Sequence, residues 1–204
     1  DDENKHRELS IYGVDTGIEL IATLRKLKQS LRGLYDFGLV EYLKPLYSKA
    51  TEIENRVRSF YDPPSLTESI QELANSLNFL LDYGLQEIYV ELKEELARLE
   101  ELVANYKTNE LKRIFETLSL EGKNAVIVSS TRNAADQDWL ICQFPELDIR
   151  EFVDFEFVNQ SSSRDKNTMI LSFGCRRPYS NTMPFRYNGT KEIVLLFEDE
   201  YYWL

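Results

Sequence analysis

Residues 124–133 read Asn124-Ala125-Val126-Ile127-Val128-Ser129-Ser130-Thr131-Arg132-Asn133. A short apolar run that ends in small polar residues is typical of a buried strand that leads into a loop and a helix. Before Gly122 the sequence is charged and follows the period of helices, whereas after Gly122 short apolar runs alternate with polar stretches. The sequence therefore predicts an α+β protein, with a helical domain over residues 1–121 and an α/β domain over residues 122–204.

Four strands are predicted in the second part, at residues 125–128, 149–158, 168–173 and 192–197. A helix over residues 131–144 is expected between the first two strands, because Pro145 ends its pattern. Apolar strands in strand–helix–strand order favour a small α/β layer with a mostly parallel sheet.

The helical part contains an internal duplication. Two segments match at a distance of about 46 residues, a length typical of helical-pair repeats; they are Leu34-Tyr35-Asp36-Phe37-Gly38-Leu39-Val40-Glu41 and Leu80-Leu81-Asp82-Tyr83-Gly84-Leu85-Gln86-Glu87. Helical pairs are expected over residues 14–60 and 60–106. Gly38 and Gly84 provide left-handed caps that end the first helix of each pair.

The helices of this part are predicted from the spacing of their leucines. First helices are expected at about 16–36 and 66–82, second helices from about 39 and 85, and a last helix at 109–118. Pro45 is expected to kink the second helix or to delay its start. The second helices either fold back on the first, which gives an antiparallel bundle, or continue them after a kink.

The bulk properties restrict the classes of function. A net charge of -11 and a pI near 4.7 argue against a broad nucleic-acid or anionic-membrane surface, although a local basic patch is compatible with them. The chain has two cysteines, Cys142 and Cys175. They cannot form a disulfide framework, and their spacing matches no metal-binding motif, so a reducing cytoplasmic location is expected. No apolar run approaches the roughly 20 residues that span a bilayer, so no membrane association is predicted. The first residue is Asp1 and the chain ends in apolar residues, which favours a piece of a longer protein.

Complete catalytic motifs are absent from the sequence. Neither Gly-x-x-x-x-Gly-Lys-Ser/Thr nor Gly-x-Gly-x-x-Gly occurs, so this chain alone is expected to bind no nucleotide. His6 is the only histidine, which argues against histidine catalysis and His-ligated metals. Cys142 is expected in the core. Cys175 stands beside Arg176, which lowers a thiol pKa, but it has no histidine partner for nucleophilic catalysis.

Polar residues follow three of the predicted strands at their carboxyl ends, where parallel sheets bind ligands. Ser130, Thr131 and Arg132 are candidates for phosphate contact through their side chains and the N-terminus of the following helix. Arg176 and Arg177 are candidates for the same role, or for an arginine finger on a phosphate held by another lobe. The alternative is ordinary helix capping by Ser130 or Thr131, with surface arginines.

Carboxylates near the strand ends allow a third reading. Asp154 and Glu156 share one face of a predicted strand, and Asp199 follows the last strand, so these residues could bind Mg²⁺ in a metal-dependent hydrolase. No lysine is placed to complete a nuclease-type site. Solvated acids at strand ends are the favoured interpretation, and no metal site is predicted.

The stretch from Asn124 to Phe197 resembles the second RecA-like lobe of helicase-like ATPases, including helicase-like proteins of phage-defence systems. The residues that carry the resemblance are the opening strand and loop at 124–133, the strand at 168–173, the Arg176-Arg177 pair and the strand that ends at Phe197. The chain departs from the family in lacking a Gln-x-x-Gly-Arg-x-x-Arg motif and in having too few strands for a full lobe. The resemblance implies a RecA/Rossmann-like layer in which Arg132, Arg176 and Arg177 contact nucleotide or nucleic acid, while a first lobe outside this chain holds ATP and Mg²⁺.

The sequence therefore supports two hypotheses of function from different classes. The first is an accessory region of a nucleic-acid-linked ATPase machine, whose helical half docks and whose α/β half contributes arginines. The second is a non-enzymatic protein–protein interaction or regulatory module. A basic surface over the strand ends favours the first function, and an exposed apolar surface on the helices favours the second.

Overall fold

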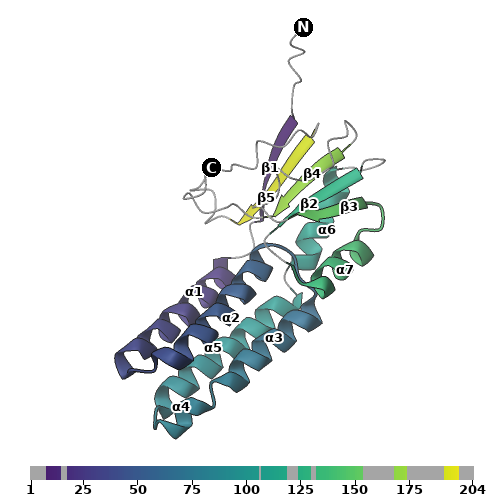
Figure 1. The fold of residues 1–204 in the computed structure, drawn as a ribbon. Helices are drawn as coiled ribbons and strands as arrows, with labels where there is room; N and C mark the ends of the chain where they lie inside the picture. The colour runs from purple at the N-terminus through teal and green to yellow at the C-terminus, as the bar shows by residue number, and fades with distance from the viewer. Residues whose placement is uncertain are drawn as a thin grey trace. The chain divides into compact units, whose positions relative to one another are not determined.

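The chain forms two compact units in the computed structural model, which describes residues 8–14, 18–105, 107–118, 124–129, 132–153, 168–173 and 191–197. The α/β unit comprises Asp1–Asp15, Arg58–Phe60 and Glu110–Leu204, and the helical unit comprises Thr16–Val57 and Tyr61–Asn109. The predicted α+β class, with a helical region and a small parallel α/β layer, is confirmed (Figure 1).

The helical unit is an antiparallel four-helix bundle with two short helical turns. Its elements are α1 (Ile18–Gly33), η1 (Leu34–Phe37), α2 (Val40–Arg58), α3 (Pro63–Ser76), α4 (Phe79–Asp82) and α5 (Gln86–Asn105). Polar contacts join α1 to α2, α2 to α3, α3 to α5 and α5 to α1, through the pairs Lys28–Glu54, Lys49–Glu72, Gln71–Glu100 and Lys26–Glu95. The four long helices therefore close into a ring around one core.

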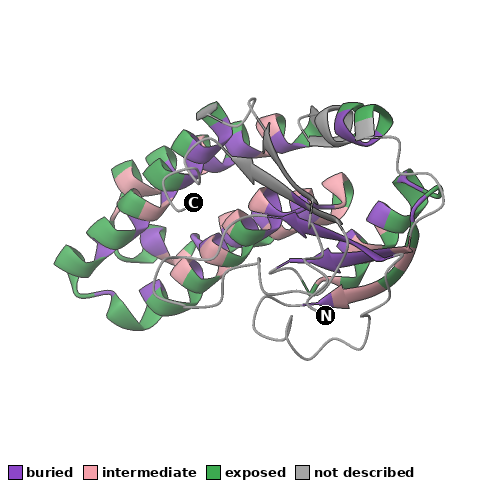
Figure 2. Cartoon of the chain, turned by 90° about the horizontal axis from the view of Figure 1, so that it is seen from above, coloured by how far each residue is buried: buried purple, intermediate pink, exposed green. Residues whose placement is uncertain are grey.

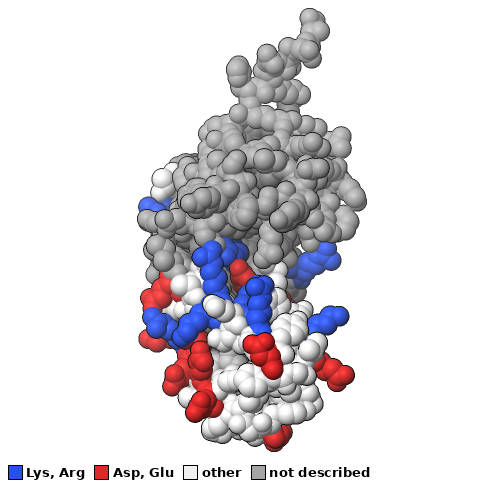
Figure 3. All heavy atoms as spheres, turned by 90° about the vertical axis from the view of Figure 1, so that its left-hand side faces the viewer, with Lys and Arg blue, Asp and Glu red and all other residues white. Residues whose placement is uncertain are grey.

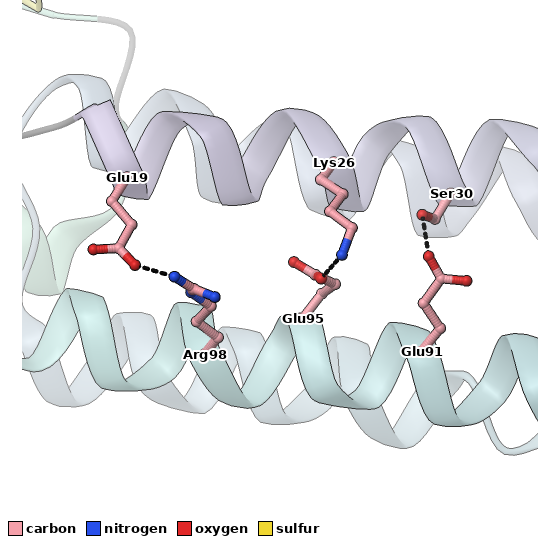
Figure 4. A network of polar contacts seen from close by, with 6 residues as sticks. All are labelled: Glu19, Lys26, Ser30, Glu91, Glu95 and Arg98. Carbon is pink, nitrogen blue, oxygen red and sulfur yellow. Dashed lines mark hydrogen bonds and ion pairs between the residues drawn. The ribbon is translucent and has the colours of Figure 1, made fainter.

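The contacts between α1 and α5 show the antiparallel order directly. Glu19 pairs with Arg98, Lys26 with Glu95, and Ser30 with Glu91, so numbers rise along α1 as they fall along α5 (Figure 4). These side chains are mostly exposed, and each such pair contributes little to stability. Buried leucines supply the packing instead, and they lie on the inner faces of the helices (Figure 2).

The internal duplication reappears in the backbone. Gly38 has φ +72° and Gly84 has φ +70°, and their N–H groups donate to the carbonyls of Tyr35 and Leu81, each at 3.1 Å. Both glycines thus end the short turns η1 and α4 in left-handed geometry, as predicted. The chain then reverses, so the kinked continuous helix is excluded. Of the two effects expected of Pro45, a kink or a delayed start, the delayed start is excluded, since α2 begins at Val40 and contains Pro45.

The glycines of the bundle give a matched stability test. Gly84→Ala is expected to lower the free energy of unfolding by about 1–2 kcal/mol, because L-residues are strained at positive φ. Gly33→Ala is expected to raise it by about 0.5–1 kcal/mol, because Gly33 has helical φ of −57° and open space around its added Cβ. Urea unfolding of both variants checks the opposite signs, and a gain in both would contradict a strained turn at Gly84.

The α/β unit contains a five-stranded, all-parallel sheet in the order β1-β5-β4-β2-β3. The strands are β1 (Glu8–Val14), β2 (Asn124–Val128), β3 (Asp148–Val153), β4 (Thr168–Phe173) and β5 (Lys191–Phe197). The helix α7 (Ala134–Gln143) also belongs to this unit, as does α6 (Lys107–Leu118) from Glu110 onward. The four predicted strands are present, and β4 has the predicted bounds. Residues 154–158 of the second predicted strand lie outside the described residues.

The division of the chain differs from the predicted boundary between residues 121 and 122. Strand β1 pairs with β5 from Glu8↔Lys191 to Val14↔Phe197, so a segment assigned to the helical domain belongs to the sheet. Residues 58–60 and the chain from Glu110 onward also belong to the α/β unit. The sheet is therefore built from segments at both ends of the sequence.

The centre of the sheet is buried on both faces. All six residues of β4, and residues 125–128 of β2, are buried (Figure 2). One face carries the cluster Val126, Val128, Val153 and Ile170. On the other face, the ring of Phe60 lies 5.1 Å from that of Phe173 and 6.0 Å from that of Phe152. Apolar strands that are buried on both faces are typical of parallel sheets.

Candidate functional site

The carboxyl ends of the strands meet at one edge of the sheet, because all five strands are parallel. Val128, at the end of β2, lies opposite Ser172 of β4 and Val153 of β3. The N–H of Ser129 donates to the carbonyl of Val153 at 3.0 Å, which extends the pairing by one residue. The chain therefore leaves the sheet after Ser129 at the buried centre of the sheet, where parallel sheets place ligand-binding residues.

Ser129, the first residue after β2, has a structural role. Ser129 is 3% exposed, and its hydroxyl contacts that of Ser59, which is 1% exposed. Ser59 belongs to the segment 58–60, far from Ser129 in sequence. The two hydroxyls satisfy each other inside the unit, as buried polar groups require. No short-range pattern in the sequence indicates this pair.

Arg132 is the one predicted site residue that the structure describes. It is exposed and immediately precedes Asn133, the N-cap of α7. The other four, Ser130, Thr131, Arg176 and Arg177, lie outside the described residues. Since β4 is the neighbour of β2, the sequence that follows β4 starts at the same edge of the sheet as Arg132.

The cap of α7 is Asn133, and the prediction of a helix from Thr131 is wrong by three residues. The Asn133 side-chain oxygen accepts a hydrogen bond from the N–H of Asp136 at 3.2 Å. Asp136 is fully buried in the first helical turn, where a carboxylate is favoured by the helix dipole. Asn133 thus takes the capping role at the start of α7.

Cys142 is exposed, so its predicted place in the core is wrong. The inner face of α7 is formed by Asp136 and Leu140, one turn apart, and Phe144 follows with its ring 4.4 Å from that of Phe115. A residue two positions beyond Leu140 turns away from that face. Cys175 and the carboxylates Asp154, Glu156 and Asp199 lie outside the described residues.

A second surface with functional character lies on the helical unit. Seven large apolar side chains are at least 40% exposed near η1, α4 and the starts of α2 and α5; they are Tyr35, Phe37, Val40, Tyr42, Leu81, Tyr83 and Val90. An exposed apolar patch of this kind marks an interaction surface. The sequence pattern around Gly38 and Gly84 predicts only the end of a helix and gives no indication of this surface. The signal that could have found it is the repetition of large apolar residues in both copies, Tyr35 with Leu81 and Phe37 with Tyr83.

Within the described part of the chain, no group of three or more His, Cys, Asp or Glu residues could hold a metal ion. None of the described helices combines the length and hydropathy that crossing a bilayer requires. No protein-family model, no curated protein and no solved structure matches this chain.

Proposed function

We propose that this chain is an accessory region of a nucleic-acid-linked ATPase machine in the cytoplasm. Its α/β unit contacts phosphate at the carboxyl edge of the sheet, and its helical unit docks a protein partner. ATP and Mg²⁺ belong to a lobe outside this chain, because no phosphate-binding loop occurs in the sequence.

The observation that carries the proposal is the position of Arg132. Arg132 is an exposed residue that directly precedes Asn133, the N-cap of α7, and it follows the buried strand β2 in the sequence. Backbone N–H groups at a helix N-terminus attract anions, and a guanidinium adds a bidentate donor for phosphate oxygens. Arg176 and Arg177 follow β4 in the sequence, and β4 ends beside β2, so the topology supports a shared phosphate-contacting edge.

Arg132→Ala is expected to weaken binding of a fluorescein-labelled single-stranded oligonucleotide about tenfold at low salt, because one charge-assisted phosphate contact is lost. The slope of log affinity against log salt should fall by about 1. Fluorescence anisotropy measures both quantities.

The matched control is Arg150→Ala, which should leave binding unchanged. Arg150 lies near the amino end of β3, where it donates to Asn124 at 3.1 Å and pairs with Asp148 at 2.9 Å. Equal affinities for Arg132→Ala and the parent chain would contradict the phosphate role. ATP turnover by this chain alone would contradict the accessory role.

The second candidate function is a non-enzymatic protein-interaction or regulatory module. The observation that favours it is the exposed aromatic surface of the helical unit, together with the net charge of -11. The two candidates differ in one measurement, because only the first requires the oligonucleotide to bind at Arg132.

A further inference from the structure

The exposed aromatic surface has an ordered internal structure. We define the bundle tip as residues 34–42 and 78–90. The rings of Tyr42 and Phe79 stack with centroids 4.5 Å apart and planes 12° apart, and Tyr83 meets Tyr42 edge-on at 5.8 Å. The Tyr83 hydroxyl donates to the Tyr42 hydroxyl at 3.4 Å. Tyr42, Phe79 and Tyr83 are therefore held against one another before any partner binds, which lowers the entropic cost of binding.

The duplication repeats the exposed residues of the tip. Tyr35 corresponds to Leu81 and Phe37 to Tyr83, and all four are at least 40% exposed. A helix stop requires the glycine and the buried leucine of this segment, but it does not require exposed apolar side chains. Contact with a partner explains why exposed apolar residues recur at the same two positions of both copies.

The tip is uniformly acidic. Its charged side chains are Asp36, Glu41, Asp82 and Glu87, all exposed, and no Lys or Arg occurs within residues 34–42 or 78–90. In the described structure none of these four carboxylates forms an ion pair. The hydrogen bond to Tyr42, with the charges of Glu41 and Asp82, raises the pKa of Tyr83. In Figure 3 the lowest part of the described surface is mostly white with Asp and Glu at its margins, and the Lys and Arg side chains lie farther up.

We propose that the bundle tip docks a basic amphipathic protein segment, whose apolar side chains cover the aromatic cluster and whose Lys or Arg side chains pair with Asp36, Glu41, Asp82 and Glu87. This inference rests on the proposed docking role of the helical unit. Aromatic anchors surrounded by charge-complementary contacts are the usual composition of specific interfaces. A helical segment would present such anchors on one face.

Charge excludes the other occupants. A second copy of this chain would bring one acidic tip against another, and like charges in an interface are strongly unfavourable. Nucleic acid would bring phosphates to the same carboxylates. A basic protein segment is therefore the occupant that matches both the apolar and the electrostatic character of the tip.

The test uses two synthetic amphipathic helical peptides, one of Leu and Lys and one of Leu and Glu, with backbone NMR of the full chain. The Leu/Lys peptide is expected to shift amide signals of the bundle tip, and the Leu/Glu peptide is expected to shift none. Tyr35→Ala/Phe37→Ala should weaken binding about tenfold or more, as loss of aromatic anchors does. Asp36→Asn/Asp82→Asn should weaken it severalfold and flatten its salt dependence.

Two control variants separate the tip from the general acidity of the chain. Glu52→Gln/Glu68→Gln removes two exposed carboxylates elsewhere on the bundle, and Ile141→Ala removes a 45% exposed apolar side chain of α7; both should bind as the parent chain does. Urea unfolding of the tip variants should agree with the parent within about 0.5 kcal/mol, because their side chains are exposed.

Each other outcome overturns the inference in a distinguishable way. Shifts on the Glu-rich outer face of α5, with none at the tip, would place docking elsewhere and leave the docking role of the helical unit intact. If no amide signal of the helical unit shifts, both docking at the bundle tip and the proposed docking role of the helical unit are contradicted. Self-association lost in Tyr35→Ala/Phe37→Ala would assign the tip to a second copy, and oligonucleotide binding lost in that variant would assign it to nucleic acid.

Discussion

Phe60→Ala is expected to lower the free energy of unfolding of the α/β unit by about 3–5 kcal/mol. The Phe60 side chain is fully buried, and its ring packs against those of Phe173 and Phe152. Truncation removes both aromatic contacts and leaves a cavity against β3 and β4, in an interior that relaxes only in part. The loss is large because Phe60 fills one face of a sheet whose central strands are entirely buried.

The measurement must report on the α/β unit alone, because a chain of two units need not unfold in one step. Trp139 of α7 lies in that unit, so its fluorescence in urea, in a Trp203→Phe background, follows the unfolding of interest. Helical circular dichroism follows mainly the bundle. Ile141→Ala is the control within the same unit, because Ile141 is 45% exposed and its truncation should cost no more than about 0.5 kcal/mol. A similar loss in the two variants would contradict the packing role of Phe60.

The sequence predicts the elements well where the determinants of structure are local. The leucine spacing of α1 and the stripe of α5 need only a helical period, and the left-handed turns at Gly38 and Gly84 need only the glycines themselves. β4 is equally clear, because a run of apolar residues between polar stretches describes a strand buried on both faces.

Non-local packing explains what the sequence did not reveal. β1 is a short segment whose partner, β5, lies at the other end of the chain, so no local pattern links the two. The same holds for Phe60, which follows α2 in sequence but packs on the sheet. Cys142 was misplaced because a ten-residue helix with a narrow inner face leaves its other apolar residues exposed.

The candidate sites also differ in whether local or non-local contacts determine them. The position of Arg132 at the carboxyl edge follows from its place after an apolar strand of a parallel sheet, and the sequence indicates both the strand and the parallel sheet. The hydroxyl pair of Ser59 and Ser129 requires two distant segments to meet, so it could not be predicted. The aromatic stack of Tyr42 on Phe79 likewise joins the two copies of the duplication, and only the folded bundle brings those copies together.

Ser65→Ala/Ser69→Ala is expected to lower the free energy of unfolding of the helical unit by about 3 kcal/mol or more, since each hydrogen bond to a charged group contributes about 1.5–3 kcal/mol. Both hydroxyls accept from the guanidinium of Arg56, which is only 2% exposed; Nη1 donates to Ser69 at 2.8 Å and Nη2 donates to Ser65 at 3.0 Å. The cap of α3 survives this change, because Asp62 accepts from the backbone N–H of Ser65.

A double-mutant cycle with Arg56→Met isolates the interaction from the effect of truncation. The combined variant is expected to be more stable than the sum of the separate losses by about 1–3 kcal/mol, because the serines matter chiefly while the buried charge is present. Urea unfolding followed by helical circular dichroism measures all four corners of the cycle. Ser76→Ala is the control on the same helix, since the Ser76 hydroxyl is exposed and bonds only its own backbone at Glu72 among the described contacts.

The coupling energy between Arg56 and the two serines shows what role the buried charge has between α2 and α3. An apolar residue at position 56 would pack without directional contacts, whereas the guanidinium of Arg56 reaches both Ser65 and Ser69, one turn apart on α3. Such a fork fixes one register of α2 on the first turns of α3. A coupling near zero would mean that the serines only fill space there. A coupling in the expected range would mean that the register of the bundle depends on this buried arginine as well as on its leucines.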